Sequence, residues 1–264
     1  MALTPAAGAG CNTSSTTPPG LHSGATVNSE IEWDTFDPQW YVRHNYSVLR
    51  ADDRELLRRT RDFFADATLT GAHCVDVGSG ANLYPVLPLL PFAHSLDLCE
   101  WSAPNVSWLR TQVDGFDELW DPYWRVCAEL PAYAAVTDPR RRLAQVGRVL
   151  RLSVFDLPRH TWDAGTMFFV ACSISADRAE YECAIGRFLD ALRPRSPFAM
   201  AFMLGSQGYG VGQRWFPAVE LRRSEVVASI AAGAYDVDIH EVPAEPPLRD
   251  GHLGMLLVTG RARG

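Results

Sequence analysis

Asp76, Gly78 and Gly80 form the pattern D-x-G-x-G within the segment HCVDVGSGANLYPVL, and Glu100 follows 20 residues after Gly80. Glycines at a turn let the backbone approach a ligand closely, because no Cβ atom stands in the way. A carboxylate at the end of the next strand can accept hydrogen bonds from both hydroxyls of a ribose, each contributing about 1.5–3 kcal/mol. The spacing therefore predicts a site for a ribose-containing ligand, and a plain strand-to-helix turn is the alternative.

The same stretch discriminates among such ligands. Leu83 stands where the dinucleotide fingerprint G-x-G-x-x-G has its third glycine, and no G-K-[ST] loop is present. All 24 basic residues are arginine, so the chain has no lysine for a phosphate-binding loop or a Schiff base. These features disfavour NAD and ATP. D-x-G-x-G with a downstream acid is typical of S-adenosylmethionine (SAM) sites, where no phosphate has to be bound.

Aromatic residues crowd the segment IEWDTFDPQWYVRHNY: Trp33, Phe36, Trp40, Tyr41 and Tyr46. Aromatic faces attract a sulfonium by cation–π interaction, and tyrosine hydroxyls can bind a carboxylate of the same ligand. The segment is therefore predicted to be an N-terminal aromatic lid. An N-terminal helix that packs its aromatic face on the domain is the alternative.

Other candidates carry weaker signals. His44 lies in the predicted lid and can act as a base, with a structural role as the alternative. The segment SQGYGVGQRWF predicts either a mobile loop over a substrate, with Tyr209 and Trp215 as its contacts, or a linker. The aromatic residues of LWDPYW, at 119–124, are expected in the core, with a wall for a flat aromatic ligand as the alternative.

The elements that must position these residues alternate between strands and helices. Apolar runs predict strands at 73–78, 94–100, 149–157, 166–172, 198–204, 235–242 and 253–262. Helices are predicted at 50–67, 83–90, 105–113, 178–192 and 223–234. This alternation implies a mainly parallel sheet covered on both faces, in which ligands bind beyond the carboxyl ends of the strands. The predicted site is therefore formed by 78–82, Glu100 and 171–173.

Composition sets the remaining expectations. The 264 residues suit one α/β domain, preceded by a disordered tail at 1–29 that is rich in small residues and proline. A net charge of −7 argues against a nucleic-acid or anionic-membrane partner. The six cysteines show no C-x-x-C pair or metal-like spacing, so no metal and a reduced, cytoplasmic setting are expected. No secretory signal and no 18-residue apolar run is recognisable, and a monomer or homodimer is expected.

Four spaced blocks make the sequence resemble the family of nicotinamide, phenylethanolamine and thioether methyltransferases. FDPQWYVRHNY resembles the family segment F-(D/E/N)-P-x-x-Y-L-x-x-x-Y, and VDVGSGANLYPVL resembles I-D-I-G-S-G-P-x-x-Y-Q-L-L. EWSAPNVSWL resembles D-(F/Y)-x-x-x-N-x-x-x-L, and the stretch from FDELWDPYW to RVLRLSV resembles a long insertion between strands two and three. Together the blocks cover 33–154.

The resemblance implies a class I SAM-dependent methyltransferase with a Rossmann-like, seven-stranded, mainly parallel sheet and helices on both faces. It implies one domain at 30–264, with the lid at 30–68 and an insertion at 106–148. The cofactor that the resemblance implies is SAM. The predicted cofactor-binding residues are Tyr41, Tyr46, Asp76, Gly78, Ser79, Gly80, Tyr84, Glu100, Trp101, Asn105, Ser153 and Val154.

Departures from the family concern the acceptor. The family usually has Asp at the positions of Glu100 and Ser153 of this chain. Two glutamates that hold an amine in the phenylethanolamine-type members fall near Cys172 or Ser173 and near Ser206. Asp250 alone matches a substrate-side carboxylate. The predicted substrate-binding residues are Trp33, Cys172, Ser206, Tyr209 and Asp250, and the candidate catalytic residues are Asp250, His44 and Tyr46.

These features predict methyl transfer to a small aromatic or heteroaromatic metabolite in bacterial secondary metabolism. Nitrogen is the first choice of acceptor atom, because orientation alone supplies about 7–11 kcal/mol and an amine needs little help from a base. An alcohol would need a base, and no Lys or Glu beside the predicted site supplies one. The alternatives are methylation of an electron-rich ring carbon, such as C3 of an indole, and an inactive methyltransferase-like binding protein.

Overall fold

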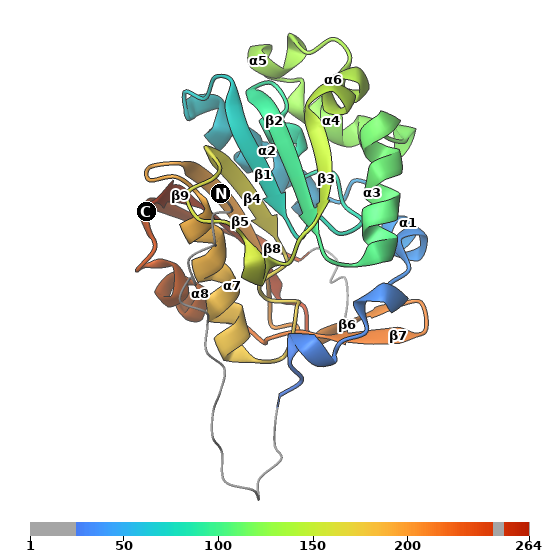
Figure 1. Ribbon diagram of the computed structural model, residues 1–264, viewed down its shortest axis with the longest axis vertical. Helices are drawn as coiled ribbons and strands as arrows, with labels where there is room; N and C mark the ends of the chain where they lie inside the picture. Colours follow the sequence, from blue (N-terminus) through green and yellow to red (C-terminus); the bar gives the residue numbers. More distant parts are fainter. Residues whose placement is uncertain (1–24, 245–250, 264) are drawn as a thin grey trace, which may run out of the picture.

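A computed structural model describes residues 25–244 and 251–263 of the chain. Its central sheet contains β1 (Ala72–Val77), β2 (Ala93–Glu100), β3 (Gly147–Arg151), β4 (Ala164–Phe168), β5 (Pro197–Leu204), β8 (Ala234–Pro243) and β9 (Gly254–Ala262). The seven strands are arranged in the order β3-β2-β1-β4-β5-β9-β8 (Figure 1). Only β9 runs antiparallel to its neighbours, β5 and β8. The predicted mainly parallel, seven-stranded sheet is therefore confirmed.

Burial explains why these segments are strands. Every residue of β4 and β5 is buried, as is typical of parallel strands covered on both faces. β8 lies at one edge of the sheet and buries only Ala234 and Val242. The continuous apolar runs therefore mark the strands at the centre of the sheet, where the carboxyl ends of β1, β4 and β5 lie side by side.

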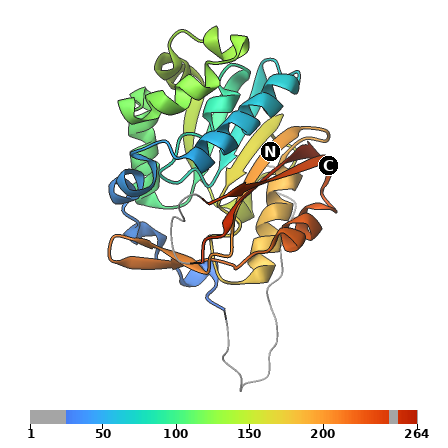
Figure 2. The same ribbon diagram turned by 180° about the vertical axis from the view of Figure 1, so that it is seen from behind.

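Helices cover both faces of the sheet. The longest, α2 (Ala51–Asp66), lies in front of the sheet in Figure 2, and α7 (Arg178–Ala191) lies in front of it in Figure 1. In α2 the apolar stripe is formed by Leu56, Leu57 and Phe64, which are all fully buried. The other helices are α1 (Pro38–Tyr46), α3 (Ala103–Gly115), α4 (Asp121–Cys127), α5 (Pro131–Ala134), α6 (Pro139–Val146) and α8 (Arg223–Ile230). Single 3₁₀ turns are η1 (Asn28–Glu30), η2 (Trp33–Thr35), η3 (Leu87–Leu89), η4 (Glu118–Trp120) and η5 (Val154–Asp156).

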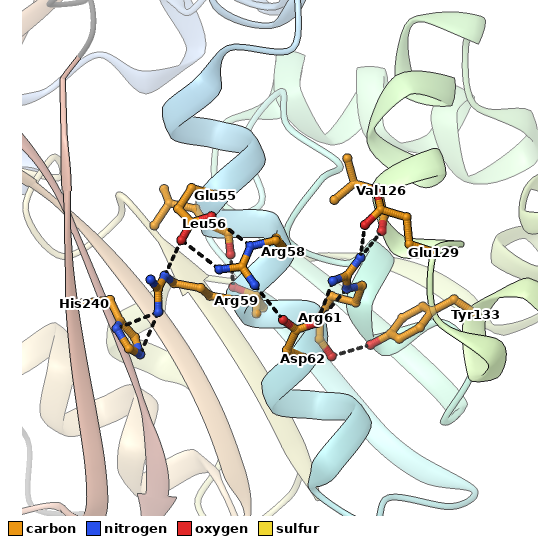
Figure 3. A network of polar contacts seen from close by, with 11 residues as sticks. Glu55, Leu56, Arg58, Arg59, Arg61, Asp62, Val126, Glu129, Tyr133 and His240 are labelled. Atoms are coloured by element: carbon orange, nitrogen blue, oxygen red, sulfur yellow. Dashed lines mark hydrogen bonds and ion pairs between the residues drawn. The ribbon is translucent and has the colours of Figure 1, made fainter.

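Polar contacts fix α2 between the edge of the sheet and the segment that joins α3 to β3 (Figure 3). Arg59 Nη1 lies 2.8 Å from Nδ1 of His240 on β8. On the other side, Arg61 pairs with Glu129 at 2.7 Å, and the Tyr133 hydroxyl donates to the Arg61 carbonyl at 3.0 Å. Because both sides of α2 are anchored, the first turn of this helix has a fixed position at the carboxyl end of the sheet.

Several segments differ from their sequence-based predictions. The strand predicted at 149–157 ends at Arg151, and η5 follows it. The stretch predicted as a helix at 83–90 contains only η3. Pro85 and Pro88 have no backbone N–H, so a longer helix would lack two of its hydrogen-bond donors. The glycine-rich segment is a β-hairpin of β6 (Gly208–Val211) and β7 (Arg214–Pro217) rather than a linker. Residues 25–29, which the composition assigns to a tail, include the start of η1, and the Thr26 carbonyl accepts a hydrogen bond from Ala176 N.

None of the helices in the described part of the chain combines the length and apolar character that a bilayer span requires.

Candidate active site

A cavity of about 1490 Å³, which includes space open to solvent, lies at the carboxyl ends of β1, β2 and β4. Its walls come from the N-terminal segment 28–46, the turn 78–82, the end of β2, and the segments 152–155 and 168–174. The hairpin β6–β7, β5 and β9 contribute Tyr209, Met203 and Met255. The position agrees with the prediction from strand order, since the turn, Glu100 and Ser173 all line the cavity.

The turn after β1 needs its first glycine for two reasons. Gly78 has a φ of 66°, in the left-handed region, and a Cβ atom there would lie 2.4 Å from Val170 Cγ2. The backbone N–H groups of Gly78 and Ser79 both donate to the Cys99 carbonyl, at 2.8 and 3.1 Å. The turn is therefore held against the end of β2 and lies close to the segment after β4.

Glu100 joins the end of β2 to this turn. Its Oε2 accepts a hydrogen bond from Gly80 N at 2.8 Å, and its Oε1 accepts from Trp101 N and Ser102 N at 2.8 and 2.7 Å. Burial raises the pKa of Glu100, whereas these backbone donors favour the ionised form and lower it. Because Oε1 already takes two donors, Oε2 is the oxygen better able to accept a hydroxyl of a bound ligand.

Two buried acceptors at the cavity lack a partner among the described residues. Asp76 Oδ1 accepts from the Thr166 hydroxyl at 2.7 Å, but Asp76 Oδ2 and Asn105 Oδ1 accept no hydrogen bond. Burial, with a smaller effect from Glu100, raises the pKa of Asp76 to about 7, although the nearby Ser79 hydroxyl and the hydrogen bond from Thr166 oppose the rise. Unsatisfied acceptors next to a cavity fit a ligand that brings donors, such as an amino group and ribose hydroxyls.

The charges around the cavity define the ligand further. Asp53, Asp76 and Glu100 line it, and none of the chain's 24 arginines is among the described lining residues. The basic group at the wall is His44, whose ring stacks on Trp40 with the centroids 4.5 Å apart. Such a cavity repels phosphate and attracts a cation. SAM fits this pattern, because it carries a sulfonium and an amino group but no phosphate.

The aromatic segment and the hairpin close the cavity together. The Phe216 ring stacks on Trp33 at 5.3 Å and on Tyr209 at 5.6 Å, and Phe36 lies 5.3 Å from it. The N-terminal segment is also tied to the start of α3, because Asp34 Oδ1 accepts a hydrogen bond from Ala103 N at 2.8 Å. Part of the aromatic segment therefore packs on the domain, while the Tyr41 and Tyr46 side chains line the cavity. That the segment acts as a lid stays a prediction.

The structure brings nearly all predicted cofactor residues to one cavity. Tyr84 is the exception: it is fully buried behind the wall, with its ring 5.9 Å from that of Tyr46. The predicted cofactor residues that line the cavity are Tyr41, Tyr46, Asp76, Gly78, Ser79, Gly80, Glu100, Trp101, Asn105, Ser153 and Val154.

The predicted acceptor residues are only partly brought together. Trp33, His44 and Tyr209 line the cavity. Cys172 and Ser206 are buried outside its lining, and the Ser206 hydroxyl donates to the Gly208 carbonyl at 3.1 Å. Asp250 lies outside the described residues. The aromatic residues of LWDPYW are core, as expected, since Trp120 and Tyr123 are fully buried.

Sequence reasoning missed one ionisable wall residue and the apolar end of the cavity. Asp53 lies in the first turn of α2, where an acidic residue favours the start of a helix, and it also lines the cavity. Phe168, Met203 and Met255 lie inside apolar runs that the sequence marks only as strands. No local signal distinguishes these strand residues, because the cavity wall forms only when β4, β5 and β9 meet.

Comparisons with known proteins agree with this geometry. The sequence profile of the NNMT/PNMT/TEMT family matches residues 25–260. Phenylethanolamine N-methyltransferase of Mus musculus is 24% identical over 78% of this chain and 77% of its own length. Nicotinamide N-methyltransferase of Sus scrofa is 24% identical over 84% of this chain and 90% of its own length.

A solved structure shares the fold. The N-methyltransferase NodS from Bradyrhizobium japonicum WM9, solved in complex with S-adenosylhomocysteine, superposes with a TM-score of 0.55. It is 9% identical, and the match covers 88% of this chain and 95% of NodS. The profile match, the strand order and the anionic, aromatic cavity lead to one conclusion: the chain belongs to the NNMT/PNMT/TEMT family and is a SAM-dependent methyltransferase of the class I fold.

Proposed function

We propose that the enzyme methylates a nitrogen of a small aromatic or heteroaromatic metabolite, in the secondary metabolism of a bacterium. The observation that carries this proposal is the composition of the cavity, which combines three carboxyl groups with aromatic and methionine side chains and has no arginine among its described lining residues. The relatives named above are N-methyltransferases, which favours nitrogen. We further propose that the enzyme acts in the cytoplasm as a monomer or homodimer.

The cofactor is assigned to the half of the cavity next to β1 and β2. Oε2 of Glu100 and Oδ1 of Asn105 are the acceptors for ribose and adenine groups, and Asp76 Oδ2 is the acceptor for the amino group of the methionine part. Tyr41 and Tyr46 face the methionine part from the lid. When bound, SAM supplies a methyl group on a sulfonium, which is already activated for transfer.

The protein's contribution is orientation and the exclusion of water. The fixed glycine turn and the buried carboxylates hold the donor, while the lid and the hairpin cover the cavity. Holding two reactants in the correct geometry lowers the barrier by about 7–11 kcal/mol. The acceptor is assigned to the half that contains Phe168, Met203 and Met255, whose side chains suit a flat ring.

Calorimetry tests cofactor binding first. We expect SAM to bind the folded protein with a micromolar dissociation constant, and no binding would contradict the proposed function. Incubation with labelled SAM and a panel of aryl amines, pyridines and indoles then identifies the acceptor by product mass and NMR. A methyl group on indole C3 would favour the ring-carbon alternative, which the same apolar wall also suits. Binding of SAM without any turnover across the panel would favour an inactive binding protein.

A further inference from the structure

The N-terminal segment runs along the cavity from one side of the sheet to the other. Near its start, Asn28 N donates to Glu180 Oε2 at 2.7 Å, and Glu180 lies on α7, which joins β4 to β5. Further along, Asp34 accepts a hydrogen bond from the start of α3, which follows β2. Because β4 and β5 lie on one side of β1, and β2 and β3 on the other, Asn28 is held on the β4–β5 side of the cavity.

Asn28 lines the cavity, and one contact fixes the orientation of its amide group. Its Oδ1 accepts a hydrogen bond from Trp33 Nε1 at 2.8 Å, and because an indole N–H only donates, the Asn28 atom that receives it must be the oxygen. Trp33 is held in turn by its stack on Phe216, since the N-terminal segment lies beside the hairpin β6–β7 (Figure 1). Among the described residues, none accepts a hydrogen bond from Asn28 Nδ2. A fixed side chain therefore keeps two N–H donors unused at the cavity wall.

The surroundings of Asn28 on this side of the cavity define what these donors suit. The Tyr209 hydroxyl donates to the Ser173 carbonyl at 3.5 Å, and the Ser173 hydroxyl lies 3.5 Å from Cys172 Sγ, so both hydroxyls have protein partners. Much of the remaining wall is apolar and includes Met203 and Met255. A donor beside an apolar wall is best satisfied by an acceptor atom of the ligand. A neutral oxygen suits this role better than a carboxylate, because the cavity already contains three carboxyl groups.

We propose that Asn28 determines acceptor specificity, and that its Nδ2 donates a hydrogen bond to a neutral oxygen substituent on the aromatic acceptor, such as a carbonyl or ether oxygen. The inference rests on the proposed function and deepens it, because it adds a residue and a substituent to the acceptor site. The contact makes and breaks no covalent bond. It holds the ring at a second point besides its apolar contacts, and so selects which ring atom or substituent reaches the methyl group.

The test compares ring compounds of the same shape with and without the oxygen. The full chain is saturated with S-adenosylhomocysteine and titrated by calorimetry with 3-acetylpyridine, 3-aminoacetophenone and 3-acetylindole. Each is paired with the analogue in which an isopropenyl group replaces the acetyl group. The variant is Asn28→Asp, which keeps the side-chain shape and an oxygen for Trp33 but replaces the N–H donors by an acceptor. Gln145→Glu is the matched control, because it makes the same amide-to-acid change at an exposed position of α6 outside the cavity lining.

We expect the wild type and Gln145→Glu to bind at least one acetyl compound about threefold or more tightly than its isopropenyl analogue, the effect of one neutral hydrogen bond. Asn28→Asp should lose this preference while its affinities for the isopropenyl analogue and for S-adenosylhomocysteine stay unchanged. A loosened N-terminal segment would weaken both members of a pair alike.

Four results would overturn the inference: equal wild-type affinity within every pair, no measurable binding of any acetyl compound, a preference that survives in Asn28→Asp, or equal weakening of both members of a pair in that variant. Weaker binding of S-adenosylhomocysteine by Asn28→Asp would overturn it too, because Asn28 would then belong to the cofactor site. Failure of the wild type to bind SAM or S-adenosylhomocysteine would instead contradict the proposed function itself, so the two failures are distinguishable.

Discussion

The Glu100 carboxylate accepts a hydrogen bond from the Gly80 N–H at 2.8 Å and so joins the end of β2 to the glycine turn after β1. One side chain therefore shapes the turn and presents an acceptor to the ligand. Glu100 is the last residue of β2 and also lines the cavity. The spacing between Gly80 and Glu100 in the sequence therefore indicates the position of the site.

Removing this carboxylate should weaken cofactor binding. We expect Glu100→Ala to raise the dissociation constant of SAM at least tenfold, which corresponds to about 1.4 kcal/mol. The variant should also melt at a lower temperature, because three backbone N–H groups lose their acceptor. Calorimetry and thermal denaturation measure both effects, with the exposed Glu118→Ala as a control. An unchanged dissociation constant would refute the ribose assignment.

Cofactor binding should depend on pH through Asp76. Because the pKa of Asp76 is raised to about 7, the carboxyl group is largely protonated at pH 5.5 and becomes ionised as pH rises. The ionised form attracts the amino group and the sulfonium, so SAM affinity should increase from pH 5.5 to 7, below the range of about 7.7–8.0 in which an α-amino group titrates. Calorimetry across this range measures the slope. Asp76→Asn should bind SAM weakly at every pH. If SAM affinity changed with pH in this variant as it does in the wild type, Asp76 would be excluded as the cause of the pH dependence.

Asp53 should make stability fall as pH rises. Its folded-state pKa, about 7, lies above the ordinary value of 3.8, so between these values the folded state holds more protons than the unfolded state. The free energy of unfolding therefore decreases with rising pH, by at most about 1.4 kcal/mol per pH unit for one proton. Urea unfolding without ligand should show Asp53→Asn gaining on the wild type from pH 5 to 7. A difference that stays constant over this pH range would show that Asp53 titrates normally.

The glycine turn should not tolerate a side chain at its first position. Gly78→Ala places a Cβ atom 2.4 Å from Val170 Cγ2 and forces alanine into a left-handed conformation. We expect a loss of about 2 kcal/mol or more in stability and no measurable SAM binding. Gly186→Ala is the matched control: this position is exposed in α7, with nothing within 4 Å of the new atom, so stability should rise by about 0.5–1 kcal/mol. Normal SAM binding by Gly78→Ala would refute the role of the turn.

The hairpin should control the lid. Phe216 packs against Trp33, Phe36 and Tyr209, and each such aromatic pair contributes about 0.5–1.5 kcal/mol. We expect Phe216→Ala to increase hydrogen exchange in residues 28–46 and to weaken SAM binding about tenfold, with little change in the exchange of β1 and β5. Trp215→Ala on the exposed side of the same hairpin, where the native side chain is 69% exposed, should leave exchange in 28–46 unchanged. Equal hydrogen exchange of residues 28–46 in both variants would show that Phe216 on the hairpin does not stabilise the lid.

Local patterns in the sequence predicted the fold and the cofactor half of the site. The alternation of apolar strands with amphipathic helices predicted a mainly parallel sheet, because strands buried on both faces must be apolar throughout. D-x-G-x-G, Glu100 and the aromatic segment predicted where a cationic, adenosine-containing ligand binds. Each of these signals is local: a turn that only glycine can form, or a residue at the end of a strand.

Only the tertiary structure decided the apolar end of the cavity. Phe168, Met203 and Met255 come from three strands that are far apart in the chain, and the sheet order alone brings them together. Cys172 and Ser206 were expected at the wall, but the chain turns their side chains into the protein interior. Asp53 has the sequence signature of a helix start, and its second role arises because contacts on both sides of α2 fix this carboxylate against the cavity. The sequence by itself determined which cofactor binds, because that site is formed by short continuous segments; packing between distant elements decided which side chains form the apolar end of the cavity.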